Sequence, residues 1–320
     1  MIQYYKHRNL SELFNDTFLF FRQNGKNFFK NYLLLNTPIF LLFGLMGYLV
    51  SDTFISPFMN GKLDGQQNFI EQMISNNFTW FVVAFVTMVL FFIFMGILNY
   101  LFPIFYLRRV VVHKENKVKM DTIFSDFKNN KWKIVKFFIG TTFFTVPVFI
   151  LVAFGTFLSI FLIIGILLIF LVTPFIVNVF NFHMYDYFST SRGFFSSFLY
   201  AVRAQFSYEE GSKSSPFWKY TGTTFVLHIL INIISWVFMI FPLILSISVE
   251  NILASDETYD EKTLFIYLIL SLVFQILSFL VLLILNNVIS IGCGFMYCDH
   301  RTDLHRKEDL LEIQNLGNDL

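Results

Sequence analysis

Five polar side chains interrupt the apolar stretches in the second half of the chain and are the first candidates for chemistry. They are Asn178, Asn181, His228, Asn232 and Asn286. Amide and imidazole groups within a membrane either hydrogen-bond to neighbouring helices or line a polar cavity. The residue types alone leave both interpretations open.

Cysteine and histidine residues gather where the last apolar stretch ends, at Cys293, Cys298, His300 and His305. These residue types can bind zinc, but their spacing matches no tight zinc site. We therefore expect no metal and no cofactor, and interpret these residues as part of a polar tail.

Catalytic signatures are missing from the sequence. It contains no Gly-x-Ser-x-Gly elbow, no His-Glu-x-x-His helix and no glycine-rich phosphate loop. The apolar stretches contain no Asp, Glu, Lys or Arg, which argues against a proton-coupled transporter. The protein is therefore expected not to be an enzyme.

The composition indicates which elements must position these residues. Of 320 residues, 56% are hydrophobic and only 14% are charged, whereas soluble domains average about 45–50% and about 25%. Too few charged side chains remain to cover a soluble surface, so the sequence predicts a polytopic membrane protein. The net charge of +1 predicts no nucleic-acid partner.

Apolar stretches predict six transmembrane helices and an all-α integral membrane fold. A helix needs roughly 20 apolar residues to cross a bilayer, and residues 32–50, 80–107, 221–248 and 263–297 each provide one span. The uncharged stretch 137–185 is long enough for two spans, with a turn expected near Gly155 and Thr156.

The distribution of Lys and Arg predicts the orientation. Of these 23 residues, 21 fall in residues 1–31, 108–136, 186–220 and the tail, and only Lys62 and Lys262 fall in the alternate loops. Because cytoplasmic loops carry the positive charge, both termini are expected to be cytoplasmic.

A short motif recurs before three of the apolar stretches, at 13–16 (Leu-Phe-Asn-Asp), 123–126 (Ile-Phe-Ser-Asp) and 194–197 (Phe-Phe-Ser-Ser). Each is followed by an aromatic residue and a lysine at the start of a span. Apolar residues around the motifs follow helical spacing, and Asn9 with Glu12 fits a capping box that begins the first of these helices. Residues 182–186 also resemble residues 295–299, and both segments end in aspartate.

These features predict three pseudo-repeats, each an interfacial amphipathic helix followed by a helical hairpin. The repeat units cover roughly 9–107, 120–185 and 194–297 of a single membrane domain spanning 1–320, with a cytoplasmic tail at 298–320. A short amphipathic helix is expected within the tail, at 308–318.

The motifs and the aromatic-lysine entries resemble a broad bacterial group of six-span membrane proteins. This group includes the membrane-embedded domain attached to some glycerophosphodiester phosphodiesterases. The resemblance covers nearly the whole chain but implies no catalytic residue, because the phosphodiesterase itself would be a separate soluble domain.

Cations beside the second motif are expected to contact anionic lipid headgroups. They are Arg108, Arg109, Lys128, Lys131, Lys133 and Lys136. Together these observations favour a non-enzymatic accessory or scaffold subunit whose partners are membrane lipids and other membrane proteins. The alternatives are a transporter or lipid-handling protein with a polar cavity between repeats and, less favoured, an intramembrane enzyme.

Overall fold

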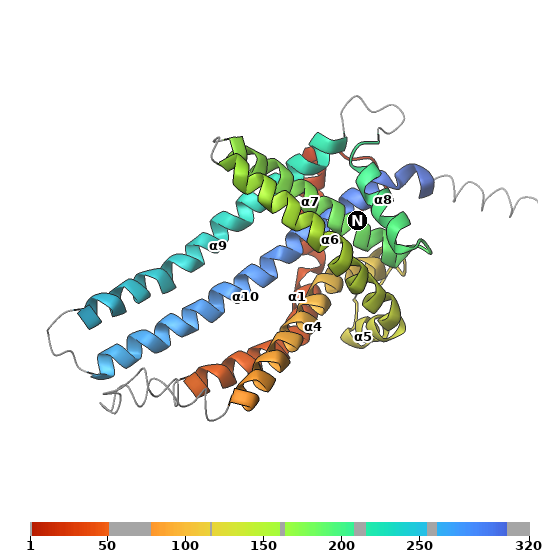
Figure 1. Cartoon of the computed structure of the whole chain (residues 1–320). Helices are drawn as coiled ribbons and strands as arrows, with labels where there is room; N and C mark the ends of the chain where they lie inside the picture. The colour runs from red at the N-terminus through yellow and green to blue at the C-terminus, as the bar shows by residue number, and fades with distance from the viewer. Residues whose placement is uncertain are drawn as a thin grey trace, which may run out of the picture. The chain divides into compact units, whose positions relative to one another are not determined.

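The computed structural model describes residues 2–50, 78–115, 117–160, 164–207, 216–254 and 261–305. The regular structure in these ranges is entirely α-helical, which confirms the predicted all-α class. The helices are α1 (Leu10–Val50), α4 (Phe78–Val111), α5 (Met120–Asn129), α6 (Lys131–Ile160), α7 (Ile164–Ser189), α8 (Phe194–Ala204), α9 (Pro216–Ala254) and α10 (Glu261–His300) (Figure 1). The helix expected at 308–318 lies outside the described residues.

Three of the described helices contain segments long and apolar enough to cross a membrane. These segments are Val86–Val111 in α4, Pro216–Leu245 in α9 and Ile269–His300 in α10, with 26, 30 and 32 residues. At about 1.5 Å per residue, each exceeds the roughly 30 Å of bilayer hydrocarbon. Membrane localisation is therefore plausible on length and composition.

The first amphipathic segment and the first apolar stretch form one continuous helix, α1. The predicted capping box begins it. The backbone N–H of Asn9 donates to a Glu12 carboxylate oxygen at 2.8 Å, and the N–H of Glu12 donates to the Asn9 side chain at 2.9 Å. In the other two motifs the short helices α5 and α8 end before the long helices begin.

The turn expected near Gly155 and Thr156 is wrong, because α6 continues through both residues to Ile160. Glycine within a helix costs only about 1 kcal/mol relative to alanine. A backbone amide left unbonded in hydrocarbon would cost several kcal/mol. Helices α6 and α7 then lie side by side (Figure 1).

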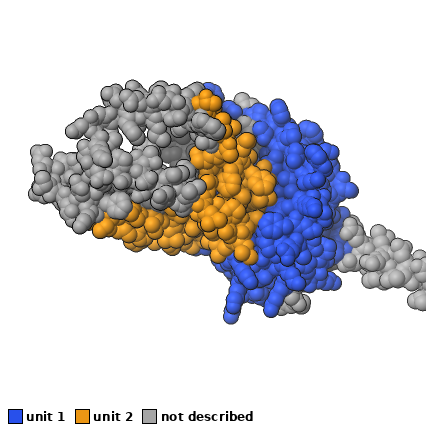
Figure 2. All heavy atoms as spheres, turned by 90° about the horizontal axis from the view of Figure 1, so that it is seen from below, with its two compact units in different colours: residues 1–31, 101–230, 286–320 blue, residues 32–100, 231–285 orange. Residues whose placement is uncertain are grey.

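The chain divides into two compact units, which Figure 2 shows in different colours. Unit 1 comprises Met1–Asn31, Leu101–Leu230 and Asn286–Leu320, and unit 2 comprises Tyr32–Tyr100 and Ile231–Leu285. The boundaries between these units differ from those of the predicted repeats. The three repeats and the single membrane domain stay predictions.

Aromatic side chains fill part of the core of unit 1. Phe20, Phe28, Phe102 and Tyr106 are fully buried, and Phe28 meets the rings of Phe102 and Tyr106 edge to face at 5.1 and 4.8 Å between centroids. Such pairs contribute beyond the area they bury. The ends of α1 and α4 that belong to unit 1 are therefore packed as a soluble core would be.

Helix α10 approaches its neighbours in unit 1 so closely that one position requires glycine. A Cβ atom at Gly294 would lie 2.6 Å from the Tyr185 hydroxyl oxygen and closer still to the Leu107 side chain. Because both contacting side chains are buried, a methyl group there would force them or the backbone to move.

Candidate functional site

Each of the three sequence motifs in unit 1 is linked to an arginine that precedes it. We call the pairs Arg8–Asp16, Arg109–Asp126 and Arg192–Asp186 the arginine clasps. Their shortest nitrogen–oxygen distances are 2.9, 2.6 and 3.2 Å. In the first two clasps the carboxylate is the fourth residue of the motif, three positions after a fully buried Leu13 or Ile123. Residues at i and i+3 share a helix face, so the acid faces the core side.

The third clasp differs because its motif carries Ser197 where the other two carry aspartate. The Ser197 hydroxyl donates to a carboxylate oxygen of Asp186 at 2.9 Å. Asp186, near the end of α7, thus takes the place of the missing motif carboxylate and pairs with Arg192. Through the fully buried Asp186, the Ser197 hydroxyl is thus linked to Arg192, much as the motif aspartates are linked to arginines in the other two clasps.

Asp186 is the centre of a larger network. Its carboxylate also accepts from the Tyr297 hydroxyl at 3.2 Å, and the Arg301 guanidinium lies 3.8 Å away. The Tyr200 hydroxyl is hydrogen-bonded to the His300 ring at 2.9 Å, and burial raises the pKa of Tyr200, which therefore stays neutral. The carboxylate, tyrosines and arginines thereby connect α7, α8 and α10.

A second fully buried acid, Asp299, connects the N-terminal segment to α9 and α10. One carboxylate oxygen accepts from the backbone N–H of Arg8 at 2.6 Å. The other accepts from the Lys219 ammonium at 2.6 Å and from the Tyr220 hydroxyl at 2.7 Å. A buried carboxylate is stable only when its oxygens are satisfied in this way.

The Arg8 side chain is itself fully buried. Besides Asp16 it donates to the carbonyl oxygens of Gln3, Tyr4 and Lys6, and its guanidinium lies 5.2 Å from the centroid of the Phe295 ring. The N-terminal segment therefore wraps around one arginine. Burial also raises the pKa of the nearby Tyr4 to about 12, with a smaller contribution from Cys298.

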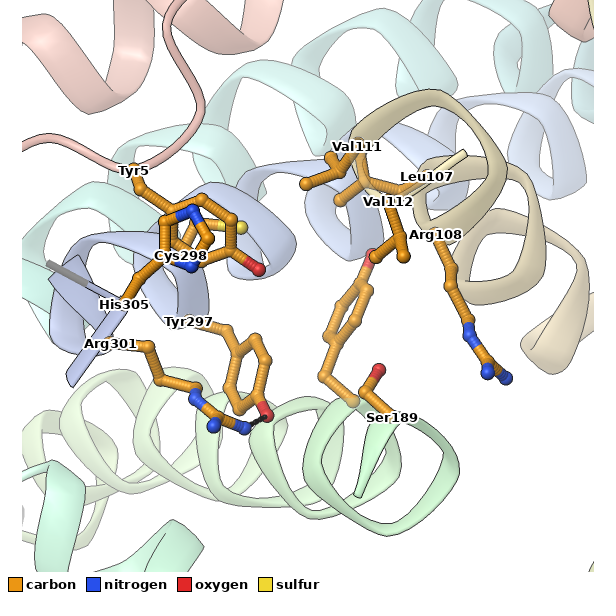
Figure 3. A pocket seen from close by; sticks show the side chains of 11 residues that line it. Tyr5, Leu107, Arg108, Val111, Val112, Ser189, Tyr297, Cys298, Arg301 and His305 are labelled. Atoms are coloured by element: carbon orange, nitrogen blue, oxygen red, sulfur yellow. Dashed lines mark hydrogen bonds between the residues drawn. The ribbon is translucent and has the colours of Figure 1, made fainter. Parts of the chain in front are cut away.

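A pocket of about 260 Å³ opens among the helix ends of unit 1. Figure 3 shows Arg301 and Tyr297 on one side, Arg108 and Ser189 on the other, and the Tyr5 hydroxyl pointing into the space. The remaining lining residues are Leu107, Val111, Val112, Tyr185, Cys298 and His305. The lining therefore combines two arginine side chains and several hydroxyls with an apolar wall from the end of α4, and in Figure 3 the Arg108 guanidinium lies beyond Ser189, away from Tyr5.

Lysine 133 adds to the positive charge beside this pocket. Its ammonium donates to the Thr190 carbonyl at 2.9 Å and lies 5.0 Å from the centroid of the Tyr187 ring. Burial, and secondarily the neighbouring Arg108, lower the pKa of Lys133. The contribution of Arg108 shows that the two cations lie near each other, while Asp186 acts in the opposite direction on the Lys133 pKa.

The structure brings together only part of the predicted polar set. Asn178 and Asn181 are buried, and their side-chain oxygens accept from Thr224 at 2.5 Å and from Ser290 at 2.7 Å. His228 is hydrogen-bonded to the Thr224 carbonyl of its own helix at 3.0 Å. Asn232 and Asn286 are exposed. The two buried amides are thus hydrogen-bonded to neighbouring helices, which is the first of the two interpretations left open by the sequence.

The predicted headgroup cations also separate into two groups. Lys128, Lys131 and Lys136 are exposed, whereas Arg108, Arg109 and Lys133 are half-buried and hydrogen-bonded to acceptors of unit 1. Sequence reasoning did not identify Arg8, Arg301 or the pocket. The resemblance between 182–186 and 295–299 was the available signal, since each segment ends in one of the two buried aspartates.

No protein-family model, no curated protein and no solved structure matches the chain. Within the described ranges, His, Cys, Asp and Glu side chains form no group of three or more that could hold a metal ion. The arrangement at the helix ends can therefore be interpreted from its own geometry: internal ion pairs that fix the helices, and one cationic pocket beside them.

Proposed function

We propose that the chain is a six-span bacterial inner-membrane protein with both termini in the cytoplasm. The three apolar helix segments in α4, α9 and α10 support this proposal, and so does the concentration of Lys and Arg in alternate loops. The stretches in α1, α6 and α7 would supply the other spans. The arginine clasps and the pocket would then lie at the cytoplasmic side.

Helices α5 and α8 support the proposal of interfacial helices. Phe124 and Phe195, the second residues of their motifs, are 49% and 61% exposed, and Trp132 and Trp218 at the following helix starts are 70% and 62% exposed. Aromatic side chains are enriched at the membrane–water interface. Exposed rings next to buried ion pairs fit a helix that lies in the headgroup region.

The arginine clasps support the threefold repeat. In each predicted repeat, an arginine outside the motif is paired with a carboxylate. This carboxylate either is the fourth residue of the motif or accepts a hydrogen bond from it. Equivalent contacts at equivalent motif positions are what duplicated units would retain.

The proposed role is that of a non-enzymatic accessory or scaffold subunit that packs against other membrane proteins. One observation carries it: the buried acids Asp186 and Asp299 are each engaged by several donors of the same chain. Charges used in this way stabilise a structure and are poorly placed to abstract a proton from a substrate.

The scaffold role can be tested by extracting the protein directly from membranes with a lipid-retaining polymer and measuring particle mass. We expect particles of one defined mass that contain other membrane proteins at constant stoichiometry. Homogeneous particles containing only this chain would contradict the role.

A lipid-handling role is the second candidate, and the pocket beside Arg108 and Arg301 favours it. Lipid-binding sites are mostly apolar with a few charged groups that fix orientation. The pocket has both features.

A further inference from the structure

We propose that the pocket of unit 1 lined by Tyr5, Arg108, Ser189 and Arg301 binds the phosphate group of an anionic membrane lipid. This inference rests on the proposed membrane location and deepens the lipid-handling candidate, but it does not depend on the scaffold role. The ligand class is a phosphate ester that carries acyl chains and a net negative charge.

The charge balance of the lining selects an anion. None of the pocket's lining residues is acidic. Arg108 donates to the neutral carbonyl oxygen of Phe188 at 3.1 Å, and within the described residues no carboxylate lies within ion-pair distance of it. Its positive charge is therefore not neutralised by a side chain of the described part.

The nearest acid does not cancel the charge on the other side. Asp186 lies 3.8 Å from Arg301, but it also faces Arg192 at 3.2 Å and accepts hydrogen bonds from Ser197 and Tyr297. The single negative charge of Asp186 is thus shared between the guanidinium groups of Arg192 and Arg301. The lining itself contains two arginines and no acid, and guanidinium is the group best suited to phosphate.

The polar contacts available to a phosphate are hydroxyls as well as cations. The Tyr5 hydroxyl points into the pocket (Figure 3), and the exposed Ser189 side chain lies at its edge beside Arg108. Hydroxyls donate to phosphate oxygens and complement the two arginines. A volume of about 260 Å³ accommodates a small headgroup.

The position of the pocket distinguishes a lipid from a free phosphate. Arg108 lies near the end of the apolar segment Val86–Val111, and Arg301 directly follows the apolar segment Ile269–His300. Both cations therefore stand where an apolar helix reaches the headgroup layer. Leu107, Val111 and Val112 form an apolar wall of the pocket, against which part of an acyl chain can pack.

The cations could instead serve only to neutralise helix C-termini, since Arg108 and Lys133 both donate to carbonyls at the end of α7. That alternative requires no ligand. It predicts that lipid binding is insensitive to charge changes inside the pocket, which separates the two explanations experimentally.

The test compares two variants that add the same charge two residues apart. Ser189→Asp places a carboxylate at the edge of the pocket, and Ser191→Asp places one on an exposed residue outside the lining. Binding of phosphatidylglycerol, with phosphatidylcholine as the neutral-headgroup comparison, is measured by native mass spectrometry of the purified full chain in detergent. We expect S189D to weaken phosphatidylglycerol binding at least about fivefold and S191D to leave it within about twofold.

A second pair removes a cation. Arg108→Gln is expected to weaken binding about fivefold, and Lys128→Gln, which removes an exposed cation outside the pocket, is expected to have little effect. Equal affinities across both pairs would overturn the proposal. Melting curves identify any variant that fails to fold, and the other pair then decides.

A competition arm separates lipid from soluble phosphate. Inorganic phosphate and glycerol 3-phosphate at millimolar concentration are expected to leave phosphatidylglycerol bound, because neither engages the apolar wall. Displacement by either would overturn the lipid assignment. Failure of the chain to enter the membrane fraction of cells would instead refute the proposed location, independently of the affinities measured in detergent.

Discussion

The contacts inside unit 1 differ in kind from the contacts inside unit 2. Unit 1 contains the arginine clasps and the buried acids Asp186 and Asp299, with donor–acceptor distances down to 2.6 Å. The described helices of unit 2 meet through neutral groups. Asn99 donates to the Asn36 side chain at 2.8 Å, and Ser278 donates to the Phe238 carbonyl at 2.8 Å.

Under the proposed membrane location, the difference has a physical reason: the ion pairs of unit 1 lie at helix ends, whereas the described contacts of unit 2 lie within apolar stretches. Charged hydrogen bonds are affordable near water, where uncompensated charge is screened, whereas in hydrocarbon only neutral, fully bonded groups are tolerated. Exposed apolar side chains accompany the neutral contacts of unit 2, as with Trp236, which is 69% exposed. Substitutions that remove a charged contact of unit 1 should therefore lower the free energy of unfolding more than substitutions that remove a neutral contact of unit 2.

The largest effect is expected from Asp299→Ala. It removes the buried carboxylate to which the Lys219 ammonium and the Arg8 N–H donate, and removing one partner of a buried ion pair costs about 3–5 kcal/mol. Denaturation of the purified chain in mixed micelles would measure the loss in free energy of unfolding. Asp121→Ala, which removes an exposed acid of α5, is the control, and an equal loss in both would remove the distinction drawn for unit 1.

Close packing in unit 1 provides the next largest effect. Gly294→Ala should lower the free energy of unfolding by about 1–3 kcal/mol, because the new methyl group overlaps Tyr185 and Leu107. Gly155→Ala is the matched control, since a Cβ atom there meets no heavy atom within 4 Å. The same unfolding assay applies, and a stabilised G294A would show that the helix ends are looser than described.

A smaller effect is expected for the neutral contacts of unit 2. Asn99→Ala removes the hydrogen bond to Asn36, and such bonds in membranes contribute about 0.6 kcal/mol on average, up to about 2. Asn232→Ala, at an exposed amide, should change the free energy of unfolding less. If N99A cost as much as D299A, the contrast between charged and neutral units would not hold.

The last prediction concerns high pH and has no expected effect near neutrality. Tyr4 has a pKa of about 12 in the folded chain, against 10.0 for an ordinary tyrosine. Above pH 10 the unfolded chain releases this proton while the folded chain retains it, so stability falls as pH rises from 10 to 12. Tyr4→Phe should make unfolding profiles less steep across this interval. An unchanged slope would mean that Tyr4 is solvated in the folded protein.

The helical class could be predicted from the sequence, and so could local features whose interacting residues lie close together in the chain. The Asn9–Glu12 capping box is an example, because both partners lie within four residues. Prediction from the sequence failed at Gly155, where glycine suggested a turn but uninterrupted backbone bonding extended α6.

The candidate site was much less predictable. Asp299 bonds to Arg8, 291 residues away in the chain, and no periodicity encodes such a pairing. Arg108 and Lys133 fit a simple headgroup-facing role by composition, yet both donate to backbone carbonyls of unit 1 and Lys133 also lies over the Tyr187 ring. Only the three-dimensional arrangement shows which cations remain available to a ligand.

The central claim is that apolar helices cross the membrane with unit 1's cationic helix ends in the cytoplasm. Single cysteines introduced as Lys128→Cys and Lys62→Cys can be treated with a membrane-impermeant maleimide in intact cells. The parent chain, whose Cys293 and Cys298 are both buried, is the unlabelled reference. We predict labelling of K62C in intact cells and of K128C only after lysis. Labelling of K128C in intact cells would contradict the orientation on which the pocket and its ligand depend.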